Sequence, residues 1–363
     1  MSVTDLASDF IVLNQHDNVA TARRTLKSGT SVAAGESGLV LRQTIPGGHK
    51  VALVSINAGG QLVKYGQIIG FAKTGIEPGD WVHTHNVELR TVGRDYCFCD
   101  EITELPALDG DEDTFLGFAR PGGKAGTRNY IGVISSVNCS ASVSRYVADR
   151  FRSSDFKSDF PNVDGVVAFT HKGGCSYDPN HGHKILQRVI AGMARHPNIG
   201  GYVLVGLGCE VNQVPGLVDK YHLDRLQDGE QAPTFLTIQQ TGGVRKTVES
   251  AVKAVERMLP DVNALQRTTQ PVSKLALAMN CGGSDANSGI SANPALGVAS
   301  DQLVRQGASS VFGETTEIYG AEHLLPRRAV TREVGEKLVS QTRWWEQHTA
   351  MFGSTIDNNP SPG

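Results

Sequence analysis

Two different hydrophobic periodicities divide this chain. Between residues 11 and 92, short apolar runs alternate with polar positions and stop at PGG, AGG and EPGD, which are turn-forming combinations. We therefore expect a small, mostly β domain over residues 1–93, with one short helix at residues 18–27. From residue 129 onward, apolar runs of strand length alternate with helical patterns, which is typical of βα units around a parallel sheet.

The βα region contains six strand-like runs. They are YIGVISSV, GVVAFTH, GYVLVGLG, TFLTIQQ, KLALAMN and SSVFGET, and helical patterns such as VRKTVESAVKAVERML separate them. We expect an acidic linker at residues 94–118, a first part of the βα region at 119–265 and a second part at 266–363. The predicted fold class is α/β, with a Rossmann-like region and a largely parallel sheet after the β domain.

Cysteines follow four of the strand-like runs, at Cys139, Cys175, Cys209 and Cys281. The carboxyl ends of parallel strands meet at one edge of a sheet, so the four thiols are expected to share a site. Filling core space is the ordinary alternative for any single cysteine. These four come after the apolar runs rather than within them, and Cys139 also opens a predicted helix, where thiolate is favoured. Thiolates suit iron, zinc or an iron–sulfur cluster.

The HTHN motif places His83 and His85 at alternate positions of a short β run, and hence on one face. Such a pair suits a metal or an anionic ligand, and two exposed polar side chains are an equal alternative. Glu210 follows Cys209 directly, which presents a hard donor beside a soft one.

Three cations lie in glycine-rich surroundings and are candidates to hold an acidic substrate: Lys50, Lys64 and Arg128. The polar, glycine-rich segment at residues 280–297 offers backbone N–H groups to a carboxylate or phosphate. It lacks the GxGxxG and Walker patterns, which disfavours a nucleotide. A long structural turn is the alternative. The candidate substrate contacts in this segment are Asn280, Gly282, Gly283, Ser284, Asp285 and Asn293.

Charge and hydropathy exclude several classes of partner. The 34 basic and 37 acidic residues give a net charge of -3, so neither nucleic acid nor an anionic membrane is indicated. The apolar runs are too short to span a bilayer, and the N-terminus has no signal-peptide layout. We expect a cytoplasmic protein with reduced cysteines.

Several longer motifs resemble the altronate and galactarate dehydratase family of bacterial sugar-acid catabolism. They include HDNVATA, GGHKVAL, VKYGQIIGFA, HTHN, GTRNYIGV, HPNIGGYVLVGLGCE, CGGSDANSGISANPALG and a final NNPSPG. The resemblance implies an N-terminal SAF-type (β-clip) domain, a divalent metal such as Fe2+ or Mn2+, and dehydration of a sugar acid to a 2-keto-3-deoxy acid. The family pattern also includes the four cysteines above, together with His49, His83, His85 and Glu210.

These residues lead to two hypotheses for the metal. In one, His49, His83 and His85 bind a single ion; in the other, three of the four cysteines hold an iron–sulfur cluster. We expect His83, His85, Lys50 and Glu210 to be catalytic, and we expect a small sugar-acid substrate and a chain compatible with a homo-oligomer. Family members continue past NPSPG, so a truncated chain or a partner chain that supplies the remainder is expected.

Three other functions remain as alternatives from the sequence. The first is elimination of sulfite from a sulfonated hydroxy acid on a related scaffold. The second is a non-catalytic protein that binds a sugar acid. The third, a nucleotide-dependent oxidoreductase, fits the βα repeat but lacks the phosphate-binding fingerprint.

Overall fold

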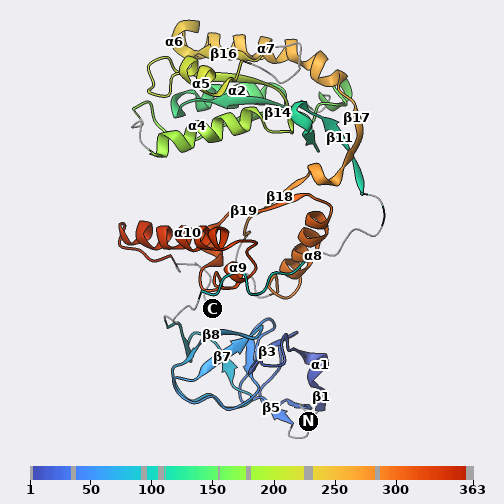
Figure 1. Ribbon diagram of the computed structural model, residues 1–363, viewed down its shortest axis with the longest axis vertical. Helices are drawn as coiled ribbons and strands as arrows, with labels where there is room; N and C mark the ends of the chain where they lie inside the picture. The colour runs from blue at the N-terminus through green and yellow to red at the C-terminus, as the bar shows by residue number, and fades with distance from the viewer. Residues whose placement is uncertain are drawn as a thin grey trace. The chain divides into compact units, whose positions relative to one another are not determined.

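The computed structural model describes residues 3–33, 38–90, 96–104, 110, 112–153, 156–176, 181–224, 232–282 and 287–356. The chain forms two compact units (Figure 1). The first comprises Met1–Pro106, Ala278–Gln302 and Ser310–Gly363, and the second comprises Ala107–Leu277 and Leu303–Ser309. Within the described ranges, every helix is too short or too polar to cross a membrane.

The N-terminal part of the first unit is built from short strands with one short helix. The elements are β1 (Val3–Asp5), α1 (Leu6–Asp9), β2 (Phe10–Ile11), β3 (Val19–Ala22), β4 (Ser31–Ala33), β5 (Leu39–Val40), β6 (Lys50–Ala52), β7 (Gln61–Lys64), β8 (Gln67–Ala72), β9 (Trp81–Val82) and β10 (Val87–Glu88). They form three sheets, ordered β2-β3-β6-β9, β10-β8-β7 and β1-β4-β5. All pairs are antiparallel except β1 with β4, which confirms the predicted β domain.

The helix predicted at residues 18–27 is wrong, because β3 (Val19–Ala22) occupies this stretch. β3 pairs with β2 on one side and with β6 on the other. All four of its residues are buried, so sheet hydrogen bonds and packing on both faces outweigh a local helical pattern.

A four-stranded sheet forms the centre of the second unit. Its strands are β13 (Tyr130–Ser135), β14 (Gly165–Phe169), β15 (Ile199–Gly206) and β16 (Thr234–Thr237), in the order β14-β13-β15-β16. All neighbours are parallel, as predicted. Because β14 lies on one side of β13 and β15 on the other, the strand order reverses between β13 and β15.

Helices cover both faces of this sheet (Figure 1). α2 (Ala141–Asp149) and α7 (Val244–Ala264) pack in one apolar cluster, and α4 (His181–Ala194) and α5 (Val214–Tyr221) pack in the other. In α7 the buried residues recur every three or four positions and so form one face: Val248, Ala251, Val255, Leu259 and Val262. Burying each of the larger side chains contributes about 1.5–3 kcal/mol, which fixes the helices on the sheet.

Smaller elements complete the second unit. β11 (Thr114–Ala119), β12 (Ala125–Gly126) and β17 (Arg267–Pro271) form an antiparallel sheet ordered β12-β11-β17, so β11 begins inside the range expected to be a linker. α3 (Phe156–Asp159) and α6 (Ile238–Thr241) are single turns. Short 3-10 helices span Pro121–Gly123, Asn138–Ser140 and Val272–Lys274.

The remaining elements come after Lys274 along the chain. They are β18 (Ala276–Met279), α8 (Ala292–Arg305), β19 (Ser309–Phe312), a 3-10 helix at Thr315–Ile318, α9 (Leu324–Arg327) and α10 (Arg332–Ala350). β18 and β19 pair with each other, which confirms the last two predicted strands. α10 begins after Thr331, whose side chain accepts a hydrogen bond from the Val334 N–H.

Candidate functional site

Three of the four predicted cysteines follow three adjacent strands of the parallel sheet. Cys139 comes after β13, Cys175 after β14 and Cys209 after β15, each within a few residues of the strand end. β13 lies between the other two strands. The structure therefore brings these three cysteines to the carboxyl edge of the sheet, next to the reversal of strand order.

Backbone hydrogen bonds hold the three cysteine-bearing loops together. The Asn138 N–H donates to the Gly173 carbonyl at 2.8 Å, and the Val211 N–H donates to the Cys175 carbonyl at 2.8 Å. Partial burial raises the pKa of the Cys139 thiol, and the neighbouring Cys175 and Cys209 thiols raise it further. The Cys139 thiol is therefore close enough to Cys175 and Cys209 to be affected by their charge.

Glu210 lies beneath this edge and is only 2% exposed. Its carboxylate accepts hydrogen bonds from the Leu207 N–H at 3.1 Å, the Gly208 N–H at 2.5 Å and the Ser136 hydroxyl at 2.9 Å. A buried carboxylate with three such donors organises the backbone of its loop. These contacts describe a residue that positions the Cys209 loop, whereas the sequence suggested a catalytic acid.

Sequence reasoning missed several polar residues that support the same edge. The buried Asn212 amide donates to the Ser136 carbonyl at 2.9 Å and accepts from Gln187 at 3.1 Å. His171 accepts from the Gly173 N–H at Nδ1, and its Nε2 lies 3.2 Å from the Ser135 carbonyl. Burial lowers the pKa of His171, so its neutral form is favoured. Both ring nitrogens are engaged, which makes this histidine a structural part of the loop.

The three predicted histidines of the β domain gather around Trp81. The His49 and His83 rings are stacked with centroids 5.2 Å apart, and the Trp81 ring lies 5.1 Å from His83 and 5.3 Å from His85. The indole Nε1–H of Trp81 donates to His49 Nδ1 at 3.3 Å. Trp81 precedes the HTHN motif by two residues, and that spacing could have indicated it.

The HTHN motif itself forms a turn and is not the β run expected from its alternation. β9 ends at Val82, and the His83 N–H donates to the Asn86 side chain at 2.9 Å. The Asn86 amide donates to the Trp81 carbonyl at 2.9 Å. An Asn that hydrogen-bonds local backbone groups favours a turn over a continued strand, which is why the pairing stops here.

Lysines add positive charge to this cluster of histidines. Lys50 is the first residue of β6 and Lys64 the last residue of β7. Burial lowers the pKa of Lys50. The pKa of Lys64 is lowered by burial and then by the charge of Lys50. Burial, followed by His49, Lys50 and His85, lowers the pKa of His83, so the groups form one electrostatically coupled, cationic cluster.

Cys281 lies with two carboxylates that the sequence did not indicate. The ligand atoms of Cys281, Glu314 and Glu317 all lie within 4.8 Å of one another, and the Cys281 N–H donates to Glu314 at 2.8 Å. In the described part of the chain, this is the single group of three such residues that is close enough to hold an ion. Glu314 and Glu317 follow β19, just as Cys281 follows β18, and paired strands bring them together.

The other predicted substrate contacts are distributed differently. Arg128 is exposed and precedes the first residue of β13, so it lies at the opposite edge of the sheet from Cys139. Asn280 and Gly282 are exposed next to Cys281, and Asn293 is exposed on α8. Gly283, Ser284 and Asp285 lie outside the described residues.

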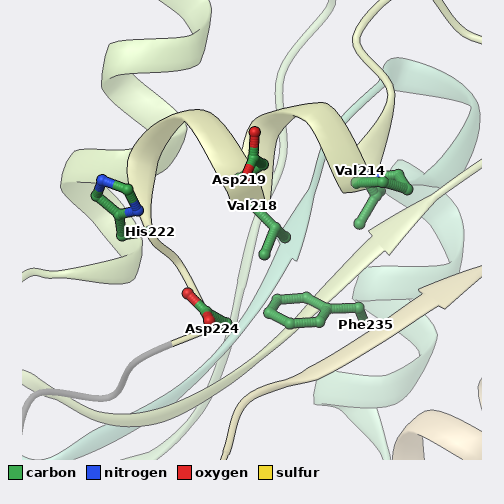
Figure 2. Close-up of a pocket in the computed structure, with 7 residues that line it drawn as sticks. Val214, Val218, Asp219, His222, Asp224 and Phe235 are labelled. Carbon is green, nitrogen blue, oxygen red and sulfur yellow. The ribbon is translucent and has the colours of Figure 1, made fainter.

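Two pockets of the second unit are lined by other residues. One is formed by α5 and the start of β16, with His222 and Asp219 on the helix side and Phe235 below them (Figure 2). The other is an open depression on α7 beside Lys253 and Glu256. Neither contains a residue predicted from the sequence.

The fold and these clusters define an α/β protein with a separate β domain, whose histidine, lysine, cysteine and carboxylate groups are typical of an enzyme. Three family descriptions match successive parts of the chain. The Altronate/galactarate dehydratase SAF domain matches residues 8–90, the D-galactarate dehydratase/Altronate hydrolase second domain matches 117–263, and the D-galactarate/Altronate dehydratase C-terminal region matches 272–363.

Curated proteins agree with these matches. Galactarate dehydratase (L-threo-forming) of Escherichia coli is 38% identical over 366 residues, and altronate dehydratase of Bacillus subtilis is 32% identical over 357 residues. Each alignment covers 98% of this chain, and 68% and 69% of the respective relative. The beta subunit of (2R)-sulfolactate sulfo-lyase from Chromohalobacter salexigens is 28% identical over 244 residues, covering 66% of this chain and 55% of the subunit. The chain belongs to the altronate/galactarate dehydratase family and is homologous to hydro-lyases.

Proposed function

We propose that this protein removes water from a sugar acid of the altronate or galactarate type and forms a 2-keto-3-deoxy sugar acid. Membership of a family of hydro-lyases supports the reaction class. The observation that carries the proposal is the cluster of His49, His83 and His85 around Trp81, which is coupled by charge to Lys50 and through it to Lys64, because it combines imidazole groups with positive charge.

Lys50 and Lys64 are suited to bind the substrate carboxylate. Burial lowers the pKa of Lys50, and burial followed by the charge of Lys50 lowers the pKa of Lys64, although Asp17 acts on Lys64 in the opposite direction. A bound carboxylate would supply negative charge and stabilise the protonated amines. Substrate binding and lysine protonation are therefore coupled.

Removal of the proton next to the carboxylate needs a base that is neutral at working pH. The lowered pKa of His83 keeps its imidazole in the free-base form. His85 contacts the same indole and is the second candidate. One of these imidazoles takes the α-proton, the β-hydroxyl leaves as water, and the resulting enol tautomerises to the keto acid.

The departing hydroxyl needs a proton donor. His49 accepts the Trp81 N–H at Nδ1, so the proton of its neutral ring is on Nε2. The same contact occupies one of the two ring nitrogens, and His49 is therefore better suited to donate a hydrogen bond than to bind a metal. Protonated Lys50 is the other candidate donor.

A divalent ion fits Cys281, Glu314 and Glu317 better than it fits the three histidines. One thiolate and two carboxylates lie within 4.8 Å of one another, and this mixture of soft and hard donors suits Fe2+ or Mn2+. When bound, such an ion supplies Lewis acidity toward a carboxylate or hydroxyl oxygen. We propose these three residues as its ligands in place of His49, His83 and His85.

A panel of aldonates and aldarates tests the proposal. The full chain is incubated anaerobically with Fe2+ or Mn2+, and 2-keto-3-deoxy acid is measured for each compound. We expect product from one or a few members, and much less product from the His83→Asn variant. If calorimetry shows that a sugar acid binds but no compound of the panel gives product, the dehydratase function is rejected and a sugar-acid-binding protein is favoured.

A second candidate reaction is elimination of sulfite from sulfolactate. It is favoured by the match over 244 residues to a sulfo-lyase beta subunit. Both reactions remove a proton next to a carboxylate and expel an anion from the neighbouring carbon, so the same cluster would serve either. Release of sulfite from (2R)-sulfolactate, with no product from the sugar acids, would select this alternative.

A further inference from the structure

We propose that Cys139, Cys175 and Cys209 form a metal site of their own, a three-thiolate site for a thiophilic divalent ion on the parallel sheet. This site lies in the second compact unit, whereas the histidine cluster and the Cys281 group belong to the first. The proposal does not depend on the dehydratase reaction, and it replaces the shared four-cysteine site expected from the sequence.

Topology brings the three residues together. β14, β13 and β15 are consecutive neighbours in the sheet and run in the same direction. Each is followed by one cysteine in the loop that leads to its helix. The strand order reverses between β13 and β15, and open α/β sheets bind ligands in the crevice at such a position.

Hydrogen bonds keep the three loops adjacent without any metal. The Cys175 loop is bonded to the Cys139 loop through Gly173 and to the Cys209 loop through Val211. Buried Glu210 binds two N–H groups of the Cys209 loop and the hydroxyl of Ser136, which precedes the Cys139 turn. The scaffold beneath the thiols is therefore organised in advance.

The exposure of the thiols argues against a core-filling role. Cys139 and Cys209 are exposed and Cys175 is half-buried, so solvent and ions reach all three. Three thiolates at one edge repel each other, and a cation would offset that repulsion. Three sulfur ligands hold Zn2+ or Fe2+ with a fourth position left open to water or another ligand.

Binding requires a small adjustment of the side chains. Among the described residues, only the Cys281 group has three ligand atoms that all lie within 4.8 Å of one another, so the three sulfurs are more widely spaced than in a loaded site. Metal–sulfur bonds are about 2.3 Å long. The proposal requires the side chains of the exposed Cys139 and Cys209 to change rotamer on binding while the hydrogen-bonded loops stay in place.

Cobalt provides a direct test on the full chain. The reduced protein is stripped of metal and titrated anaerobically with Co2+ alone. In the Cys281→Ser variant, which removes the thiolate of the other proposed ion site, we expect an intense thiolate-to-cobalt charge-transfer band and visible bands typical of tetrahedral coordination, with the charge-transfer band saturating at one equivalent. Adding the triple change C139S/C175S/C209S to this variant should remove these bands, while adding the double change C97S/C99S should leave them.

The outcomes separate the alternatives. Absence of the charge-transfer band from the wild-type protein, or its loss in Cys281→Ser alone, would overturn the proposal. Acid-labile sulfide that depends on the same three cysteines would replace the single ion with an iron–sulfur cluster. Should the triple variant fail to fold, the single variants Cys139→Ser and Cys209→Ser, both at exposed positions, should each weaken Co2+ binding at least tenfold, and unchanged binding in both would contradict the site.

Discussion

The hydroxyl of Ser136 donates a hydrogen bond to the carboxylate of Glu210 at 2.9 Å, and both residues are buried. Ser136 follows β13 and Glu210 lies in the loop after β15, so the bond joins the two strands between which the strand order reverses. The cysteine-bearing loops on either side are thereby fixed relative to each other. The following predictions test this edge of the sheet and the cluster around Trp81.

Replacing Glu210 with Gln should destabilise the second unit. The NH2 group of the glutamine cannot accept a hydrogen bond, so one backbone N–H of the Cys209 loop would lose its acceptor. The remaining hydrogen bonds would be made to a neutral amide oxygen and no longer to a charged carboxylate. We expect a loss of about 1–3 kcal/mol in the free energy of unfolding, measured by urea denaturation of the full chain. The exposed Glu256→Gln on α7 is the matched control and should leave the midpoint unchanged. An E210Q midpoint equal to wild type would contradict the structural role.

Gly206 and Gly216 should respond in opposite directions to replacement by alanine. At Gly206 a Cβ would lie 2.5 Å from Glu210 Oε1 and 2.6 Å from Val214 Cγ2, so the loop or the carboxylate must move. At Gly216, inside α5, a Cβ would meet nothing within 4 Å. We expect Gly206→Ala to cost about 1–3 kcal/mol and Gly216→Ala to contribute about 0.5–1 kcal/mol. Thermal unfolding of both variants measures the difference, and equal shifts would argue against close packing at Gly206.

Loss of the catalytic base should reduce turnover far more than substrate binding. His83 and His85 are each replaced by Asn. In the variant that lacks the catalytic base, we expect kcat to fall by about 10²- to 10⁴-fold. Substrate affinity, measured by calorimetry, should change by only a few fold, because the lysines remain. His16→Asn, an exposed position in the same β domain, serves as the control. Wild-type kcat in both variants would remove the Trp81 cluster from the mechanism.

The alkaline limit of activity should lie below the ordinary lysine pKa of about 10.4. Burial lowers the pKa of Lys50, so its charge, and with it binding of the substrate carboxylate, is lost earlier than for a solvated lysine. Lys50→Arg keeps the charge and should move this limit of kcat/KM to higher pH, whereas the exposed Lys27→Arg should not. If the alkaline limit of kcat/KM is the same in K50R as in wild type, the limit is set by a group other than Lys50.

The lowered pKa of Lys50 also predicts how the stability of the protein changes with pH. In the window between the lowered folded pKa of Lys50 and its higher unfolded pKa, the unfolded chain binds more protons than the folded one. The contribution of Lys50 to stability therefore rises as pH increases through that window. Denaturation midpoints of wild type and Lys50→Met are compared across alkaline pH. The wild-type midpoint should rise relative to that of the variant as pH increases. A wild-type midpoint that falls relative to the variant would contradict this prediction.

Much of the fold follows from local patterns. The alternation of apolar runs and helical periods correctly indicates β13 to β16 and the helices between them, because burial on a sheet or along one helix face requires those spacings. One exception is residues 18–27, where β2 and β6 impose a strand on a segment with a helical pattern. Local pattern could not reveal those partners, since they lie elsewhere in the chain.

The candidate site divides in the same way. The sequence by itself determined the family, the cysteines after successive strands and the histidines of the β domain, because these are properties of short segments. Only the tertiary structure decided that Trp81 gathers the histidines, that Glu314 and Glu317 join Cys281, and that Arg128 lies at the opposite edge of the sheet. Strand order and long-range pairing decide which loops meet, and no short segment of sequence contains that information.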